Sequence, residues 1–146
     1  MLREIDARIA VEVFGMPLPE WTPTHAEVSS AYFSSVGHPK WHDWPWEILY
    51  WGTDQPIKWE PRRFSTEIGS AWLVVEKMKE LGWSATVIVD DTYGDGAMFE
   101  KGDSNGPNYR FGEAGLLASG DEFLNRRTAP EAICIAARAA LSQGDA

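Results

Sequence analysis

The sequence predicts an α+β fold in which an antiparallel sheet is sandwiched between helices, as α-β-α layers. Three segments have helical periodicity, at the start, the middle and the end of the chain. Between the second and the third lie short runs that alternate and are rich in β-branched residues. With 146 residues, 44% of them hydrophobic, the chain suits one compact domain spanning residues 1–146.

The first helix is predicted at the start of the chain, and Gly15 followed by Pro17 is expected to end it. Its apolar residues recur at spacings of three and four, and they are Leu2, Ile5, Ile9 and Val13.

Residues 16–61 form a long insertion between the first two helices. They hold seven of the nine prolines and six of the eight tryptophans. Within them, residues 46–52 favour a short strand and residues 24–35 a helical turn or two. A connection this long in a compact domain usually serves as a functional loop. Because disordered segments are poor in aromatic residues, we expect an ordered, aromatic-rich insertion.

The central helix is predicted over residues 64–83. Ser65 or Thr66 is the expected N-cap, and Gly82 is placed to end the helix in a left-handed conformation. The predicted core-facing stripe is Ile68, Ala71, Trp72, Val75 and Met78.

Three strands and a helix complete the predicted fold. The strands are expected at residues 83–91, 96–102 and 108–111. In the final helix, Thr128 is the expected N-cap and Glu131 completes a capping box. Cys134 in this helix is read as a small buried apolar residue in a reducing compartment.

Composition excludes several classes of function. A net charge of −9 argues against binding a nucleic-acid polymer, which needs a surplus of Lys and Arg. A single cysteine excludes an internal disulfide. No apolar run approaches the roughly 20 residues that span a bilayer, and the N-terminus does not read as a signal peptide. We therefore expect a cytoplasmic protein that does not bind membranes.

Three blocks of the sequence resemble the phage ABA-sandwich family: LREIDARIAVEVFG, FSTEIGSAWLVVEKM and TAPEAICIAARAAL. The resemblance implies an α-β-α layered fold, a phage or prophage origin, and the cytoplasm of a bacterial host. It brings no catalytic residues with it. The aromatic insertion matches nothing in the family pattern.

Two apparent motifs fail on spacing. Gly94-Asp95-Gly96 follows a strand as a dinucleotide fingerprint does, but the third glycine would fall at Phe99. A calcium loop starting at Asp91 would place Gly102 where a bidentate glutamate is needed. We read this stretch as an acidic hairpin turn and expect no metal ion or cofactor there.

The only histidine-carboxylate cluster is His38, His42 and Asp43. A spacing of four would align the two histidines on a helix for zinc binding or acid-base work. Pro39 and Pro45 oppose a helix at this place. A small hydrolase centred on these residues is one alternative for the function.

Aromatic residues of the insertion are candidates for stacking on a nucleobase. The expected platforms are Trp41, Trp44, Trp46 and Tyr50. Alternatively, the aromatic residues form a satellite core or join a homo-oligomer, since Trp and Tyr are favoured at interfaces.

Two helix starts resemble each other as candidate phosphate sites, because free amides and flanking arginines both attract anions. The residues are Arg62, Arg63, Ser65 and Thr66 at the central helix, and Arg126, Arg127 and Thr128 at the last. Pairing of the arginines with nearby acids is the structural alternative.

Together these features favour a phage protein that binds a small nucleotide and sequesters it without turnover, such as a host defence signal (a cyclic nucleotide or an ADP-ribose derivative). This biological step is an analogy. A protein-protein inhibitor or virion-assembly factor that uses the aromatic loop as its interface is the main alternative.

Overall fold

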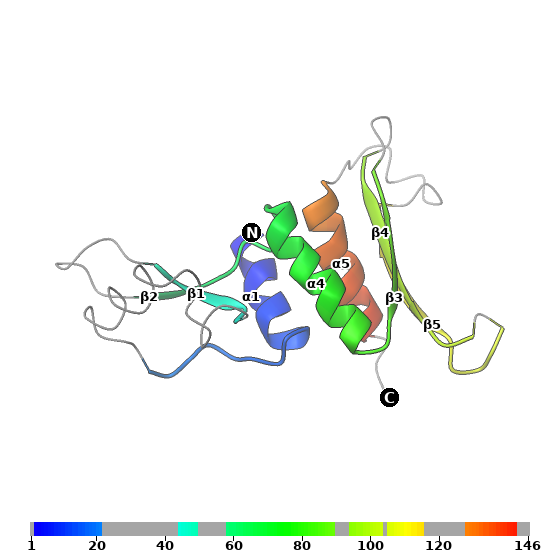
Figure 1. Ribbon diagram of the computed structural model, residues 1–146, viewed down its shortest axis with the longest axis horizontal. Coiled ribbons are helices and arrows are strands. Elements are labelled where there is room, and N and C mark those ends of the chain that lie inside the picture. The colour runs from blue at the N-terminus through cyan, green and yellow to red at the C-terminus, as the bar shows by residue number, and fades with distance from the viewer. Residues whose placement is uncertain are drawn as a thin grey trace.

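The computed structural model describes residues 2–21, 44–49, 58–89, 94–103, 105–115 and 128–142 (Figure 1). The helices are α1 (Leu2–Glu12), α4 (Ile68–Glu80) and α5 (Ala129–Ser142). The strands are β1 (Trp46–Leu49), β2 (Lys58–Pro61), β3 (Ser84–Ile88), β4 (Gly96–Lys101) and β5 (Arg110–Ala114). This mixture of helices and antiparallel strands confirms the predicted α+β class.

The strands form two antiparallel sheets. The larger sheet has the order β3-β4-β5, with Thr86 opposite Met98 and Met98 opposite Glu113. In the smaller sheet β1 pairs with β2, so that Trp46 lies opposite Pro61. The sequence predicted β1 but not β2, which lies in the same proline-rich insertion.

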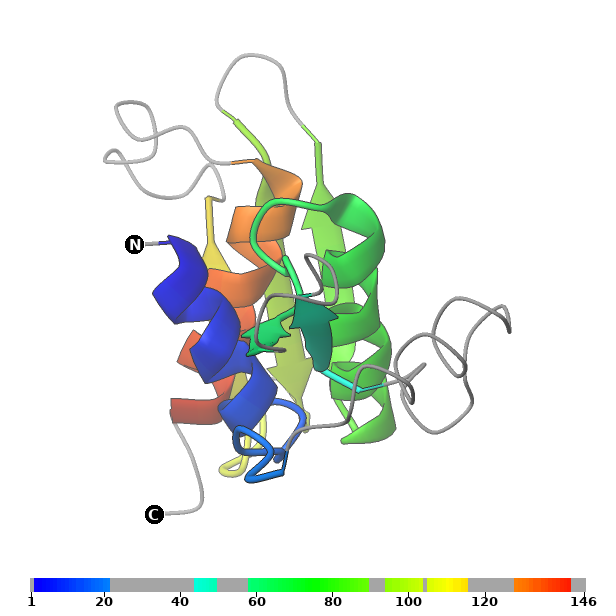
Figure 2. The same cartoon turned by 90° about the vertical axis from the view of Figure 1, so that its left-hand side faces the viewer.

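The described helices all lie on one side of the three-stranded sheet, although the sequence led us to expect helices on both faces. In Figures 1 and 2, α4 and α5 lie side by side against the sheet, with α1 on their far side and β1-β2 beyond it. On the other face of the sheet, Thr86 and Glu113 are exposed. The same face also carries the apolar side chains of Met98, Ile88 and Phe111, of which the last two are 38% and 39% exposed.

Helix α5 packs closely on the large sheet because the residues in contact are small. A Cβ atom added at Gly112 of β5 would lie 2.1 Å from the backbone nitrogen of Ala140. Phe99 on β4 is fully buried. The amide of Glu131 donates to the Thr128 hydroxyl at 3.4 Å, which confirms Thr128 as the N-cap. The buried side of α5 consists of Ala129, Pro130, Ala132, Ile133, Cys134, Ala136, Ala137 and Ala140.

The start of α4 differs from the prediction. The N-cap position is Glu67, with no side-chain capping bond, so the assignment to Ser65 or Thr66 was wrong. Ser65 is instead buried, and its amide donates to Asp6 Oδ1 at 2.8 Å, which ties this turn to α1. The other end is as predicted, with Gly82 at φ 99° in the left-handed region.

The core-facing side of α4 is Ala71, Val74, Val75 and Met78. The predicted stripe was therefore partly wrong: Ile68 is 56% exposed and Trp72 is 49% exposed. The predicted stripe and the observed buried side both have helical spacing. Helix α5 covers the side of α4 that carries the smaller residues. Trp72 is left at the edge of the contact between helix and sheet.

Candidate functional site

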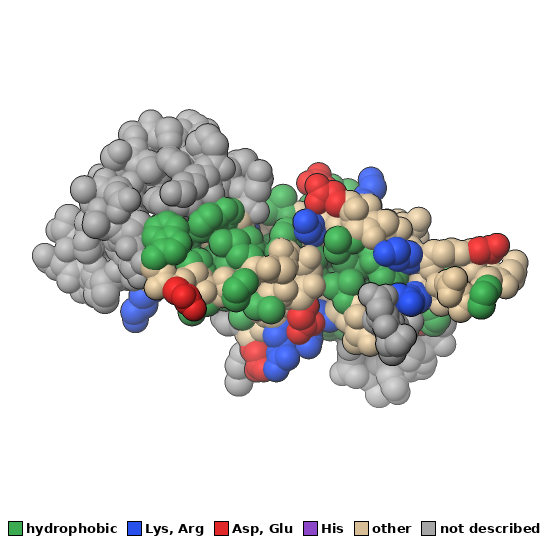
Figure 3. Space-filling view, turned by 90° about the horizontal axis from the view of Figure 1, so that it is seen from below, with side chains coloured by type: hydrophobic (Ala, Val, Ile, Leu, Met, Phe, Trp, Pro, Cys, Tyr) green, Lys and Arg blue, Asp and Glu red, His purple; other side chains and the backbone are tan. Residues whose placement is uncertain are grey.

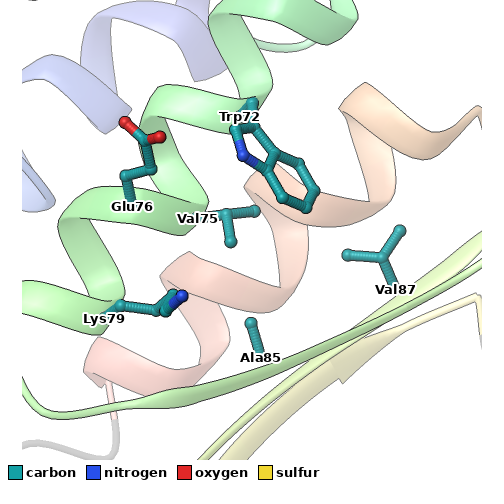
Figure 4. A pocket seen from close by; sticks show the side chains of 6 residues that line it. All are labelled: Trp72, Val75, Glu76, Lys79, Ala85 and Val87. Atoms are coloured by element: carbon teal, nitrogen blue, oxygen red, sulfur yellow. The ribbon is translucent and has the colours of Figure 1, made fainter.

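A groove of about 310 Å³ lies between α4 and β3 (Figure 4). Helix α4 forms one wall, and the strand forms the other side. The residues lining it are Trp72, Val75, Glu76, Lys79, Ala85 and Val87.

Helical and strand periodicity together place these side chains. Trp72, Val75 and Lys79 follow one another about one turn apart along α4. Val75 is buried, whereas Trp72 is half exposed at the rim. On β3, Ala85 and Val87 point to the helix side because side chains alternate between the faces of a strand. The groove thus has an apolar interior with one large aromatic ring at its border.

The strand below the groove is an edge strand. Among the described strands, β3 pairs only with β4, so none of them pairs with the backbone groups of its other edge. Its sequence, SATVI, contains no charged residue and no proline. Ile88 and Val89, at its end, are 38% and 74% exposed. The opposite edge strand, β5, differs because it carries Arg110 and Glu113.

Two charges of opposite sign also line the groove. Glu76 and Lys79 are both exposed, and neither forms an ion pair within the described part of the chain. Their neighbours differ in this respect, since Lys77 Nζ lies 3.6 Å from Glu80 Oε2. The groove can therefore offer both an anion and a cation to a bound molecule.

The predicted aromatic platforms are only partly available. Trp46 is 5% exposed and its Nε1 donates to the Met16 carbonyl at 2.8 Å. It belongs to the core, so its assignment as a stacking platform was wrong. Trp44 is half-buried and packs edge-on against Trp21, with ring centroids 6.1 Å apart. Trp59 joins this cluster, with its centroid 5.8 Å from that of Trp44.

The cluster of Trp21, Trp44 and Trp59 fits the alternative of a satellite core. Trp59 Nε1 donates to the backbone carbonyl of Trp21 at 2.8 Å, which ties the Trp59 ring to the main chain at Trp21. Part of this region remains accessible, since Leu18 is 53% and Trp21 42% exposed. Figure 3 shows hydrophobic side chains gathered at this end of the molecule, near β1-β2. Trp41 and Tyr50 lie outside the described residues.

The predicted anion sites are also only partly described. Arg62 Nε donates to the carbonyl of Trp44, so this side chain has a structural role. Ser65 is buried, whereas Arg63 and Thr66 are exposed at the turn before α4. At α5 the Thr128 hydroxyl caps the helix, and Arg126 and Arg127 lie outside the described residues. The starts of α4 and α5 lie at the same end of the helix layer in Figures 1 and 2.

The catalytic alternative gains no support from the described chain. His38, His42 and Asp43 fall outside it. Within it, no group of three or more His, Cys, Asp or Glu side chains could hold a metal ion. Burial raises the pKa of the Cys134 thiol, and the carboxylates of Asp6 and Glu131 raise it further. A thiol held neutral in this way is a poor nucleophile.

The groove was not predicted from the sequence, although the helix and the strand that form it were both predicted. Trp72 was assigned to the core, and the strand over 83–91 was predicted without its place in the sheet. The absence of charge from β3 was the one available signal of an edge that accepts a partner.

In comparisons with known proteins, no family model, no curated protein and no solved structure is significantly similar to the chain. The resemblance to phage ABA-sandwich proteins stays a prediction. None of the helices in the described segments is both long and apolar enough to cross a membrane.

Proposed function

We propose that this chain is a protein-binding domain that holds a segment of a partner protein in the groove between α4 and β3. The observation that supports the proposal is Trp72, a half-exposed tryptophan beside the edge of β3 with which no described strand pairs. Tryptophan is enriched among the residues that dominate binding energy at protein interfaces. The apolar side chains of Val75 and Val87 next to it provide further surface for a partner to bury.

The proposal is tested by selecting peptides from a random displayed library and measuring their affinity for purified variants. Trp72→Ala is expected to lower the affinity for the selected peptides about thirtyfold, which corresponds to an interface residue that contributes about 2 kcal/mol of binding free energy. Trp21→Ala is the matched control, because this tryptophan has a similar exposure, 42%, on another surface. Circular dichroism checks that both variants fold. If selection yields no peptide, or if Trp72→Ala leaves the affinities unchanged, the groove is not the binding surface.

Sequestration of a small nucleotide is the second candidate, with the phage origin and host cytoplasm that the resemblance implies. The observation that favours it is that the starts of α4 and α5 lie at one end of the helix layer (Figures 1 and 2). Exposed Arg63 and Thr66 stand next to the first of these helix starts. An anion near both starts would meet free amides and the positive ends of two helix dipoles.

Calorimetry against linear nucleotides, cyclic nucleotides and ADP-ribose compounds tests this second candidate. Arg63→Ala is expected to lower affinity about ten- to a hundredfold, the loss of one charge-assisted hydrogen bond. Arg8→Ala is the matched control, since Arg8 pairs with Glu4 on the surface of α1. If wild type binds none of these compounds at high micromolar concentration, the candidate is abandoned.

A further inference from the structure

This inference rests on the proposed function and names the kind of partner. We infer that the groove takes a basic, extended segment of another protein, which pairs with β3 as a fourth strand of the β3-β4-β5 sheet. Its alternate side chains are apolar and point to α4. Backbone pairing gives this mode its affinity, and the side-chain pockets give it specificity.

The backbone of β3 supplies the first part of the argument. At the edge of an antiparallel sheet, every second residue points its N–H and C=O groups away from the neighbouring strand. Strand β3 has five residues, Ser84–Ile88, and none of the described strands occupies its outer side. A helix laid in the groove would leave these groups to water, whereas an extended segment pairs with them.

The two edges of the sheet differ in their protection. Charged side chains are a common device that keeps a sheet edge from pairing with another chain. Strand β5 has Arg110 and Glu113, and α5 approaches so closely that Gly112 has no room for a side chain. Strand β3 has no charge and no proline, and its last residue, Ile88, is 38% exposed. The fold is therefore open to strand addition on the β3 side.

The groove fixes the side-chain pattern of the added strand. Residues paired across neighbouring strands point to the same face of a sheet. Partner residues opposite Ala85 and Val87 thus point to α4, where Trp72 and Val75 can cover them (Figure 4). Partner residues between them point to the outer face, next to exposed Thr86. The segment fits if it alternates apolar and polar residues.

Charge decides between another protein and a second copy of this chain. The chain has 22 Asp and Glu against 13 Lys and Arg, a net charge of −9, so its field attracts basic partners and opposes self-association. At the groove itself, exposed Glu76 offers a carboxylate to a basic side chain of the segment and exposed Lys79 offers a cation to an acidic one, so the preference for a basic segment comes from the net charge of the chain. We therefore assign the groove to a basic segment of a different protein.

The probe is a capped heptapeptide, Lys-Thr-Val-Thr-Val-Thr-Lys, labelled for fluorescence anisotropy; its two valines and both lysines share the face that points to α4 and Glu76. Two derivatives carry N-methyl groups on alternate backbone amides, one on each set. Methylating the set that faces β3 is expected to weaken binding about ten- to a hundredfold through the lost hydrogen bonds. Methylating the other set should change affinity less than about threefold. Replacing both lysines with glutamate should weaken binding about two- to fivefold, and Glu76→Gln should reduce that preference.

Variants of β3 provide the matched controls. Val87→Lys places a charge in the groove and is expected to abolish peptide binding, whereas Thr86→Lys places the same charge on the outer face and should retain it. Urea unfolding checks that both variants are folded. Should Val87→Lys not fold, Ala85→Lys takes its place in the same comparison.

The outcomes separate the inference from the proposed function. Equal binding of both methylated derivatives, no binding of the heptapeptide, or preference for its glutamate form would overturn the inference. If library peptides still bind through Trp72 in such a case, the proposed function stands. A wild-type dimer in light scattering that Val87→Lys dissociates would assign the groove to a second copy and also overturn the inference.

Discussion

Trp72 illustrates how a correct helix can be given the wrong buried face. From periodicity alone it belongs to a stripe with Ile68 and Val75, and a core position would make Trp72→Ala cost about 3–5 kcal/mol. Because the side chain is 49% exposed, we now expect a loss of about 1–2 kcal/mol in the free energy of unfolding. Phe99→Ala, at a fully buried position, should cost about 3–5 kcal/mol. Urea unfolding of the two variants measures the difference, and equal losses would contradict this placement.

At the same scale, Cys134 was predicted as a buried apolar residue, and its burial confirms this. Desolvation, and next the charge of Asp6, raises the pKa of the thiol, so the native protein holds almost no thiolate at pH 8. The side chain should resist a disulfide reagent at pH 8 and react within minutes in guanidinium. Cys134 is the only cysteine, so the coloured thiolate that the disulfide reagent releases reports the reaction of this residue alone. Rapid labelling of the native protein would show that α5 opens easily.

At the scale of elements, contact between α5 and β5 depends on one glycine. An alanine Cβ at Gly112 would lie 2.5 Å from the Ala136 carbonyl oxygen as well as 2.1 Å from the Ala140 nitrogen. Since backbone cannot move as a side chain does, Gly112→Ala should lower the free energy of unfolding by roughly 3 kcal/mol or more. Gly69→Ala is the matched control, because nothing lies within 4 Å of its added Cβ. In helix α4 it should stabilise the protein by about 0.5–1 kcal/mol. Urea unfolding measures both changes, and a loss below about 1 kcal/mol for Gly112→Ala would contradict the packing.

The types of the elements followed from local patterns, whereas their partners did not. Helices α1, α4 and α5 and strands β3, β4 and β5 were predicted because periodicity and capping act over a few residues. Strand β2 was missed since Lys58–Pro61 ends in proline and is held by pairing with β1 and by the Arg62 amide bonding to the Pro45 carbonyl at 2.9 Å. Ser65 was taken for a cap because no local pattern reveals a bond to Asp6, 59 residues away.

At the scale of the molecule, the candidate site is a product of topology. A strand with the same sequence could equally lie in the middle of the sheet, where neighbouring strands would pair with both of its edges. Only the order β3-β4-β5 makes β3 an edge, and only the packing of α4 places Trp72 beside it. The side chains that line the groove could therefore be assigned to a helix and a strand from the sequence. That the helix and the strand lie side by side and form one groove could not be predicted.

The arrangement of layers also predicts how the whole molecule opens. Strands β1 and β2 form a two-stranded sheet beyond α1, and such a sheet is marginally stable by itself. Its attachment includes buried Trp46, whose Nε1 bonds to the Met16 carbonyl. By contrast, β4 lies between two strands and beneath α5, with Phe99 fully buried.

We therefore expect amide hydrogens of β1 and β2 to exchange through local opening, at a lower free energy than those of β4 and α5. Native-state hydrogen exchange with increasing urea measures both groups. The amides of β4 and α5 should follow global unfolding, whereas those of β1 and β2 should depend little on urea. Trp46→Phe, which removes the bond to Met16 but retains an apolar ring, should speed exchange in β1 and β2 and leave β4 relatively unchanged. If all the amides exchange at one common free energy, the two sheets unfold as a single cooperative unit and this division is wrong.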